Sequence, residues 1–180
     1  MIIPPDPIRE AAAYQRYLLD ALGEDDPADA QATTATTMRE LIDAAGSDLR
    51  TRPAEGEWSV LECLGHILDA EVVYSGRYRW TIAHEAPELI GYDQDLWVAR
   101  LGHVDDDPEA LFAHFSAMRI ANLALWRGSS VDDRRRVGIH RERGPESYDL
   151  SFRLIGGHDR IHLAQARAAL AAVGDLRSAG

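Results

Sequence analysis

Apolar residues recur at steps of three and four along most of this chain, and no segment shows a convincing alternation of apolar and polar residues. The first spacing places apolar side chains on one face of an α-helix, whereas alternation is typical of a half-buried strand. Helices with one apolar face bury it by packing against one another. The sequence therefore predicts an all-α protein, a four-helix bundle whose long helices lie in the segments 25–46, 60–84, 107–128 and 148–174.

The N-terminal part of the chain has a shorter helical segment at 6–23, ahead of the four long ones. We interpret residues 1–26 as an N-terminal extension with this additional short helix, and residues 27–180 as the bundle domain. A chain of 180 residues is long enough to bury a sizeable core in one domain, and no internal repeat divides it.

Local signals support the predicted helix boundaries. Ser59 precedes the segment 60–84, and Glu62 follows it at the spacing of a capping box. The sequence DQDLWVARLG, residues 93–102, predicts a short helix in the connection between the second and third long helices.

The charge and composition of the chain exclude several classes of protein. The net charge is −11, and all 19 basic residues are arginines. They form one cluster, DDRRRVGIHRERG at 132–144, and are otherwise dispersed along the chain. We expect this cluster to be a solvated loop. A nucleic-acid backbone would be repelled by such a chain. No apolar run has the length of a membrane span, and the N-terminus lacks the pattern of a secretory signal. We therefore expect a cytoplasmic protein without nucleic-acid or membrane partners.

The chain has a single cysteine, Cys63. One cysteine excludes an internal disulfide framework and a zinc site built from several cysteines, which fits a reducing compartment. Its apolar neighbours favour a small buried side chain over a metal ligand or a reactive thiol.

Two histidines lie four residues apart on the apolar stripe of the last long segment. His158 and His162 follow Leu154 at steps of four, so the three side chains point to one face of a helix. Buried imidazoles need partners for their nitrogens, and a divalent metal can take a lone pair from each of two histidines at this spacing. Hydrogen-bonded or pH-sensitive histidines without a metal are the alternative interpretation.

A third histidine, His66, lies in the middle of the segment 60–84 among apolar residues. Taken alone, it is typical of a core histidine satisfied by hydrogen bonds. In a bundle, however, metal ligands come from facing helices, so His66 and the pair on the last helix can form a three-histidine site. Three nitrogen ligands leave open positions on a zinc-like or nickel-like ion for water or substrate, which is the feature of a catalytic site.

Three separated segments carry a resemblance to a known family. They are GEWSVLECLGHILDAE at 56–71, GYDQDLWV at 91–98 and HDRIHLAQ at 158–165. Together, and in this order, they resemble the DinB-like (DinB/YfiT) superfamily of four-helix metalloproteins, over roughly residues 27–173. The resemblance leaves the first helix as an addition to the family fold.

The resemblance implies a metal site. In the family, one histidine of the second bundle helix and an H-x-x-x-H pair of the fourth hold the metal, and these positions correspond to His66, His158 and His162. The implied cofactor is a divalent transition metal, zinc or nickel in the first place, with iron or manganese as alternatives. Characterised relatives include thiol S-transferases that use mycothiol or bacillithiol, a maleylpyruvate isomerase, and proteins named as metal-dependent hydrolases.

The leading hypothesis is an enzyme that activates a thiol or a water at the metal and acts on a small molecule by thiol transfer or hydrolysis. In the first case a low-molecular-weight thiol is the cosubstrate, and the arginines of 132–144 are candidates to hold its carboxylates. The alternative is a non-catalytic, stress-related bundle that binds a metal or ligand, because the sequence shows no unmistakable general base beside the triad. We also expect a homodimer, since the family often dimerises and four tryptophans and six tyrosines exceed the need of one small core.

The sequence also suggests positions for several other polar residues. Three that share helices with the predicted ligands are candidates to accept a hydrogen bond from an imidazole: Glu62, Asp69 and Gln165. His114 shares a helix face with apolar residues, so we expect it to point inward. The remaining histidines fall at expected helix ends or in loops, where we expect them to be solvated: His84, His103 and His140.

Overall fold

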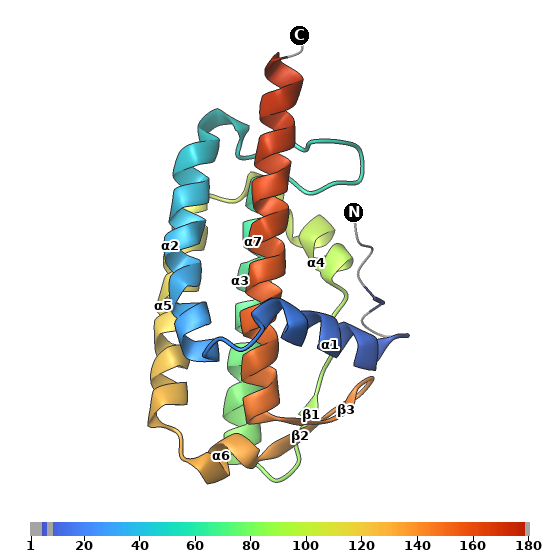
Figure 1. Ribbon diagram of the computed structural model, residues 1–180, viewed down its shortest axis with the longest axis vertical. Coiled ribbons are helices and arrows are strands. Elements are labelled where there is room, and N and C mark those ends of the chain that lie inside the picture. Colours follow the sequence, from blue (N-terminus) through green and yellow to red (C-terminus); the bar gives the residue numbers. More distant parts are fainter. Residues whose placement is uncertain (1–4, 7–8, 179–180) are drawn as a thin grey trace.

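The computed structural model describes residues 5–6 and 9–178 of the chain. Within this part of the chain, four long helices lie side by side along the long axis of the molecule (Figure 1). They are α2 (Pro27–Ala45), α3 (Val60–Ala83), α5 (Pro108–Gly128) and α7 (Tyr148–Ser178). The predicted all-α four-helix bundle is therefore confirmed.

Shorter elements connect and flank the long helices. The N-terminal helix α1 (Ala11–Leu22) crosses α7, and α4 (Gln94–Leu101) lies in the connection between α3 and α5 (Figure 1). Two 3-10 turns, η1 (Gly46–Asp48) and η2 (His103–Asp105), follow α2 and α4. The short helix α6 (Val131–Arg135) follows α5.

A small sheet lies at one end of the bundle, and the sequence analysis did not predict it. Strand β1 (Glu88–Leu89) pairs in parallel with β2 (Val137–His140), which pairs antiparallel with β3 (Gly144–Ser147). Strands this short give no visible period of two. The expectation of a solvated loop at 132–144 is wrong, because this segment contains most of α6, all of β2 and the turn into β3.

The N-terminus of α3 has the predicted capping box. The Ser59 hydroxyl accepts a hydrogen bond from the Glu62 amide at 3.3 Å, and the Glu62 carboxylate accepts one from the Ser59 amide at 2.9 Å. Asp26 and Asp107 cap α2 and α5 with their carboxylates, and a proline follows each of them. Local sequence thus sets where three of the four long helices begin.

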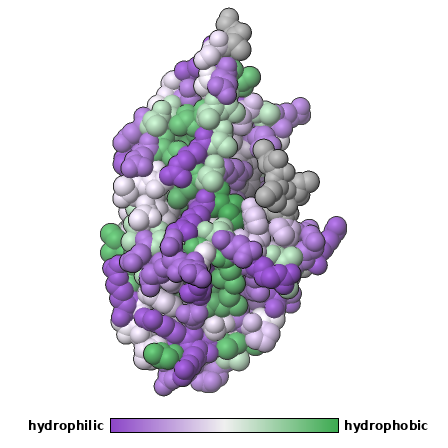
Figure 2. Space-filling model, in the orientation of Figure 1, coloured by the Kyte–Doolittle hydropathy of each residue, from purple (hydrophilic) through white to green (hydrophobic). Residues whose placement is uncertain are grey.

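Apolar side chains of the long helices form the core. One cluster of buried residues surrounds Leu64 and Phe115, and a second contains Trp126 and Phe152, whose rings stack with centroids 4.0 Å apart. On the face shown in Figure 2, hydrophilic and hydrophobic residues are interspersed. No helix of the described residues combines the length and the hydropathy that crossing a membrane requires.

A pair of glycines on α7 lets α1 approach it closely. A Cβ atom at Gly157 would lie 1.8 Å from the backbone oxygen of Leu18, and one at Gly156 would lie 3.0 Å from the Leu22 side chain. Only the absence of a side chain at 157 allows this backbone contact. Helix α1 therefore covers α7 immediately before His158.

We predict that Gly157→Ala lowers the free energy of unfolding by about 2 kcal/mol or more, because the new methyl group forces α1 away from α7. Gly174→Ala, on the same helix but with open space around it, is the matched control and should raise stability by about 0.5–1 kcal/mol. Urea unfolding of both variants tests this. Equal effects of the two substitutions would show that the contact with α1 imposes no constraint.

His103 lies in η2 and is buried, so the expectation that it is solvated is wrong. Its Nε2 is 2.8 Å from an oxygen of Asp69 on α3, and its Nδ1 is 2.7 Å from Asp106. Gly65 makes room for the ring, because a Cβ there would lie 2.4 Å from His103 Cγ. The hydrogen bond to Asp69 and then that to Asp106 raise the pKa of His103 to about 9. The charged imidazole thus fastens the α4–α5 connection to α3.

The raised pKa predicts a pH-dependent contribution to stability. Below pH 6.5, His103 is protonated in both the folded and the unfolded protein, and its ion pairs contribute fully to the free energy of unfolding. This contribution is lost as the pH rises through about 9, where the folded protein releases the proton. We predict that His103→Gln costs about 2 kcal/mol at pH 6 and much less at pH 9.5. His84→Gln, at an exposed position, is the control. Urea unfolding at both pH values measures the difference, and a cost independent of pH would contradict the charged state.

Candidate metal centre

The structure brings His66 of α3 together with His158 and His162 of α7. One ring nitrogen from each lies within 4.8 Å of the other two, and all three residues are buried. The Nε2 atoms of His66 and His158 are 2.9 Å apart. The i, i+4 spacing on α7 places two rings one above the other, and the facing helix supplies the third.

Burial makes the three imidazoles neutral at physiological pH. Burial, followed by the neighbouring histidines, lowers the pKa of His66 and of His158 well below the usual value. Burial also lowers the pKa of His162, to about 4. Neutral imidazoles keep an unshared lone pair, which is the form that binds a metal.

Gln165 orients one of the three rings. Its Oε1 is 2.9 Å from Nδ1 of His162. An amide oxygen only accepts hydrogen bonds, so Nδ1 carries the proton and Nε2 offers its lone pair. The predicted role of Gln165 as an acceptor for an imidazole is therefore confirmed.

The cluster fits a divalent transition metal. The Nδ1 atoms of His66 and His158 are buried and have no hydrogen-bond partner among the described residues. Converging lone pairs on neutral rings are costly in a buried site unless a cation or a proton lies between them. Three imidazole nitrogens suit zinc, nickel or iron, and among the described residues the group contains no fourth ligand.

Two aromatic rings lie beside the histidines. Trp58 has its ring centroid 5.2 Å from that of His66 and 6.0 Å from that of His162, and Tyr92 lies 6.4 Å from His66. No feature of the sequence had pointed to either ring as a neighbour of the histidines. These rings form an apolar wall that limits the access of water to the cluster.

The other candidate residues lie away from the cluster. Asp69 binds His103, and Glu62 binds Ser59 and Arg52, so neither is an acceptor for the triad. Cys63 is fully buried, and burial raises its pKa to about 12, which confirms a buried rather than a reactive thiol. His114 is exposed on α5, so its expected inward position is wrong.

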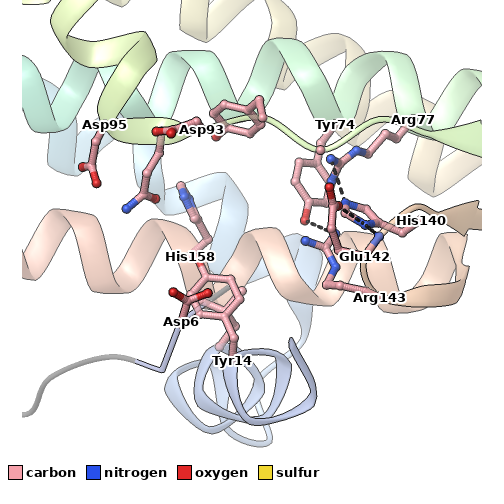
Figure 3. A pocket seen from close by; sticks show the side chains of 14 residues that line it. Asp6, Tyr14, Tyr74, Arg77, Asp93, Asp95, His140, Glu142, Arg143 and His158 are labelled. Carbon is pink, nitrogen blue, oxygen red and sulfur yellow. Dashed lines mark hydrogen bonds and ion pairs between the residues drawn. The ribbon is translucent and has the colours of Figure 1, made fainter. Parts of the chain in front are cut away.

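A cavity of about 380 Å³ leads away from His158. Figure 3 shows Asp93 and Asp95 on the His158 side, with Tyr74, Arg77, His140, Glu142 and Arg143 gathered at the other end. Helix α1 contributes Tyr14 and Leu18 to the wall. Of the arginines in 132–144, only Arg143 lines this cavity, and Glu146 pairs with it.

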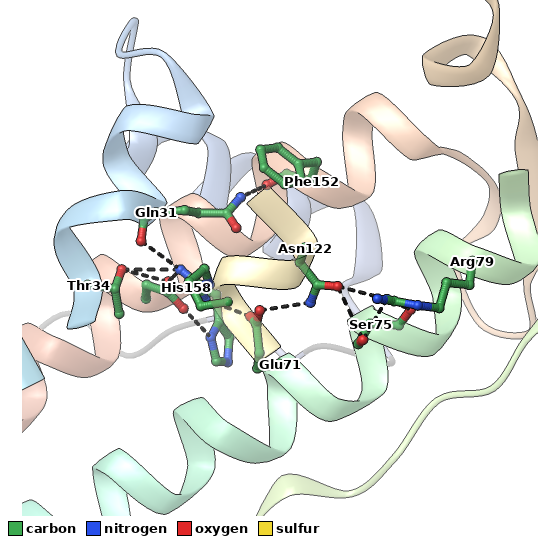
Figure 4. Close-up of polar contacts among 10 residues, drawn as sticks. Gln31, Thr34, Glu71, Ser75, Arg79, Asn122, Phe152 and His158 are labelled. Atoms are coloured by element: carbon green, nitrogen blue, oxygen red, sulfur yellow. Dashed lines mark hydrogen bonds and ion pairs between the residues drawn. The ribbon is translucent and has the colours of Figure 1, made fainter. Parts of the chain in front are cut away.

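A buried ion network lies next to the histidines, and the sequence analysis missed it (Figure 4). Arg119 of α5 donates to Glu71 of α3 at 2.7 Å and to Asp159 of α7 at 2.6 Å. Thr34 of α2 donates to the same Asp159 oxygen at 2.8 Å. An arginine within the apolar pattern of 107–128 was the available signal, because a buried charge requires a charged partner.

We predict that replacing any one of the three histidines with alanine lowers metal affinity by more than about 100-fold, since loss of a mere supporting residue already costs about 10–100-fold. His114→Ala, at an exposed position, should keep full occupancy. Elemental analysis of the variants, purified without a histidine tag, measures the metal content. Full occupancy in His66→Ala would exclude the three-histidine site.

The chain is similar to proteins of known sequence and structure. A protein from Oceanobacillus iheyensis, provisionally named metal-dependent hydrolase OB0782, is 27% identical over 124 residues, which are 69% of this chain and 72% of that protein. The structure of YfiT from Bacillus subtilis, described as a probable metal-dependent hydrolase with an unusual four-helix bundle topology, matches with a TM-score of 0.73. The structural match covers 96% of this chain and 94% of the YfiT chain, with 17% sequence identity, and shows that the two proteins share a fold. Residues 29–166 match the DinB superfamily, and this chain belongs to that superfamily.

Proposed function

We propose that this protein is a metal-dependent enzyme in which His66, His158 and His162 hold a divalent transition metal, with zinc or nickel favoured and iron or manganese as alternatives. One observation carries the proposal: His158 belongs both to the three-histidine cluster and to the wall of the cavity. The three histidines would hold the metal beside a space that can accept a small molecule. A closed structural site would instead need a fourth protein ligand.

The residues around the cluster have defined roles in this proposal. A bound divalent metal would lower the pKa of a water or a thiol, which would then be available as a nucleophile near neutral pH. Gln165 keeps His162 in the tautomer that presents Nε2. Trp58 and Tyr92 restrict the access of bulk water to the rings. The cavity positions the small molecule beside His158.

The reaction class is hydrolysis or thiol transfer. The names of both relatives support hydrolysis, and the size of the cavity suits a small-molecule substrate. Thiol transfer, with a low-molecular-weight thiol as cosubstrate, uses the same lowered pKa on sulfur instead of oxygen. Homodimer formation and a cytoplasmic location stay predictions of the sequence.

Turnover by the metal-loaded protein tests the proposal. We predict that zinc- or nickel-loaded protein hydrolyses small activated esters or amides, or transfers a low-molecular-weight thiol to monochlorobimane. Metal removal and His66→Ala should each reduce the rate to that of the uncatalysed reaction, because both remove the activated nucleophile. His114→Ala is the matched control and should retain the rate. Full metal occupancy without turnover in either assay would favour the non-catalytic binding protein.

A further inference from the structure

Arg77 of α3 is a buried cation without a carboxylate partner. Its side chain lines the cavity and only 2% of the residue is exposed. No carboxylate of the described residues lies at ion-pair distance from it; the nearby Glu146, whose charge also acts on Arg77, pairs with Arg143. The other fully buried arginine, Arg119, has two carboxylate partners, and the neighbouring Arg143 has Glu146. Arg77 therefore departs from the way in which this chain neutralises its other buried cations.

Three contacts hold the guanidinium group of Arg77 in place. Its Nη2 donates to the backbone oxygen of Ile90 at 2.6 Å and to Nε2 of His140 at 3.2 Å. The ring of Tyr74 lies beneath it, with Cζ 4.5 Å from the centroid. Both of these hydrogen bonds come from Nη2, and Nε is buried without a hydrogen-bond partner among the described residues. The group is thus fixed at one side and has unused donors.

His140 does not neutralise this charge. Burial, then Arg143 and Arg77, lower the pKa of His140 to about 4, so its ring is neutral at physiological pH. Because arginine only donates, Nε2 of His140 accepts from Arg77. Nδ1 of His140 faces Glu142, 3.0 Å from its carboxylate and 3.3 Å from its backbone nitrogen. The His140 ring therefore separates Glu142 from Arg77. The expectation that His140 is solvated is wrong. Exposed and buried residues alternate along β2, and His140 is one of the buried residues, packed against α3.

A buried charge is stable when an opposite charge or a full set of hydrogen bonds compensates it. The chain supplies neither in full to Arg77, and the unused donors belong to a residue of the cavity wall. Guanidinium groups bind carboxylates and phosphates with charge-assisted hydrogen bonds. We infer that Arg77 binds the carboxylate or phosphate of a small molecule that occupies the cavity and extends toward His158.

The position of Arg77 sets the shape of this ligand. Arg77 lies eleven positions after His66 on α3, which is a rise of about 16 Å along the helix. The acidic group and the group at the histidines are consequently several bonds apart. Asp93 and Asp95 lie on the His158 side of the cavity, whereas at the other end two arginines, Arg77 and Arg143, face one lining carboxylate, that of Glu142 (Figure 3). An acidic group is therefore favoured at the Arg77 end. The identity of this ligand as a substrate rests on the proposed function, whereas binding of the acidic group does not.

Binding to the metal-free, full-length protein tests the inference separately from catalysis. The probes are glutarate and inorganic phosphate, with glutaramide and sodium chloride at equal ionic strength as neutral and salt controls. We expect at least one of the two acids to raise the melting temperature and to shift the Arg77 Nε resonance in ¹⁵N NMR spectra. A response to glutarate alone identifies a carboxylate site, and a response to phosphate alone identifies a phosphate site.

Two variants locate the effect. Arg77→Met should lower the affinity for the effective acid at least tenfold, while Arg79→Met should leave it unchanged. Arg79 lies two residues further along α3 and is exposed, and it binds Ser75 and Asn122 outside the cavity. If Arg77→Met fails to fold, the NMR titration of the unmodified protein still decides the question. Neither acid shifting the Arg77 resonance, or an equal affinity in Arg77→Met, overturns the inference, even if the metal-loaded enzyme is active.

Discussion

The ion network around Arg119 joins all four long helices at one level of the bundle. Its guanidinium binds Glu71 of α3 and Asp159 of α7, and donates to the backbone oxygen of Gln31 on α2. A buried arginine is tolerated only with such partners, and loss of one partner leaves an uncompensated charge. Sliding any of these helices along its axis would break a charged contact. The network therefore fixes the relative heights of the helices, which apolar packing alone leaves less well specified.

The position of the histidine cluster depends on this register. Asp159 directly follows His158 on α7, and Glu71 lies five residues after His66 on α3. Both carboxylates bind the same guanidinium, so the two helices that carry the histidines are held level where the rings meet. The Nδ1 atoms of His66 and His158 have no hydrogen-bond partner among the described residues. The backbone positions, more than hydrogen bonds of the rings to the rest of the chain, thus bring the Nε2 atoms of His66 and His158 within 2.9 Å of each other.

Short-range features were readable in the sequence, and features that depend on distant segments were not. The capping box of Ser59 and Glu62 and the i, i+4 pair of His158 and His162 lie within one or two turns of helix, so spacing alone reveals them. His66 joined the pair because a bundle presents facing helices to one another. The fold, the superfamily and the convergence of the three histidines were thus accessible before the structure, whereas the metal they would hold was not.

The errors share a different cause. His103 and His140 lie in polar, charged stretches that resemble solvated connections, yet each is buried by a contact made far along the chain. His103 meets Asp69, which is 34 residues away, and His140 meets Arg77, which is 63 residues away. Neither pairing leaves a local pattern, because nothing in the sequence of α3 shows which of its polar residues meets a distant histidine. The many charged residues around His103 and His140 therefore led to a wrong prediction of exposure, because the chain folds back on α3 at both places.

Most buried polar groups of the interior find their partners within the chain. Arg119 has two carboxylates, and His103 has a carboxylate at each ring nitrogen. Among the groups that do not, two face one cavity: the neutral histidine cluster at the His158 end, and the cation of Arg77 at the other. Because unsatisfied buried groups cost stability, their survival at two places in one cavity is better explained by bound groups than by imperfect packing. The two ends also differ in chemistry, since lone pairs attract a cation and a guanidinium attracts an anion. A metal and an acidic small molecule together would satisfy what the folded chain leaves open.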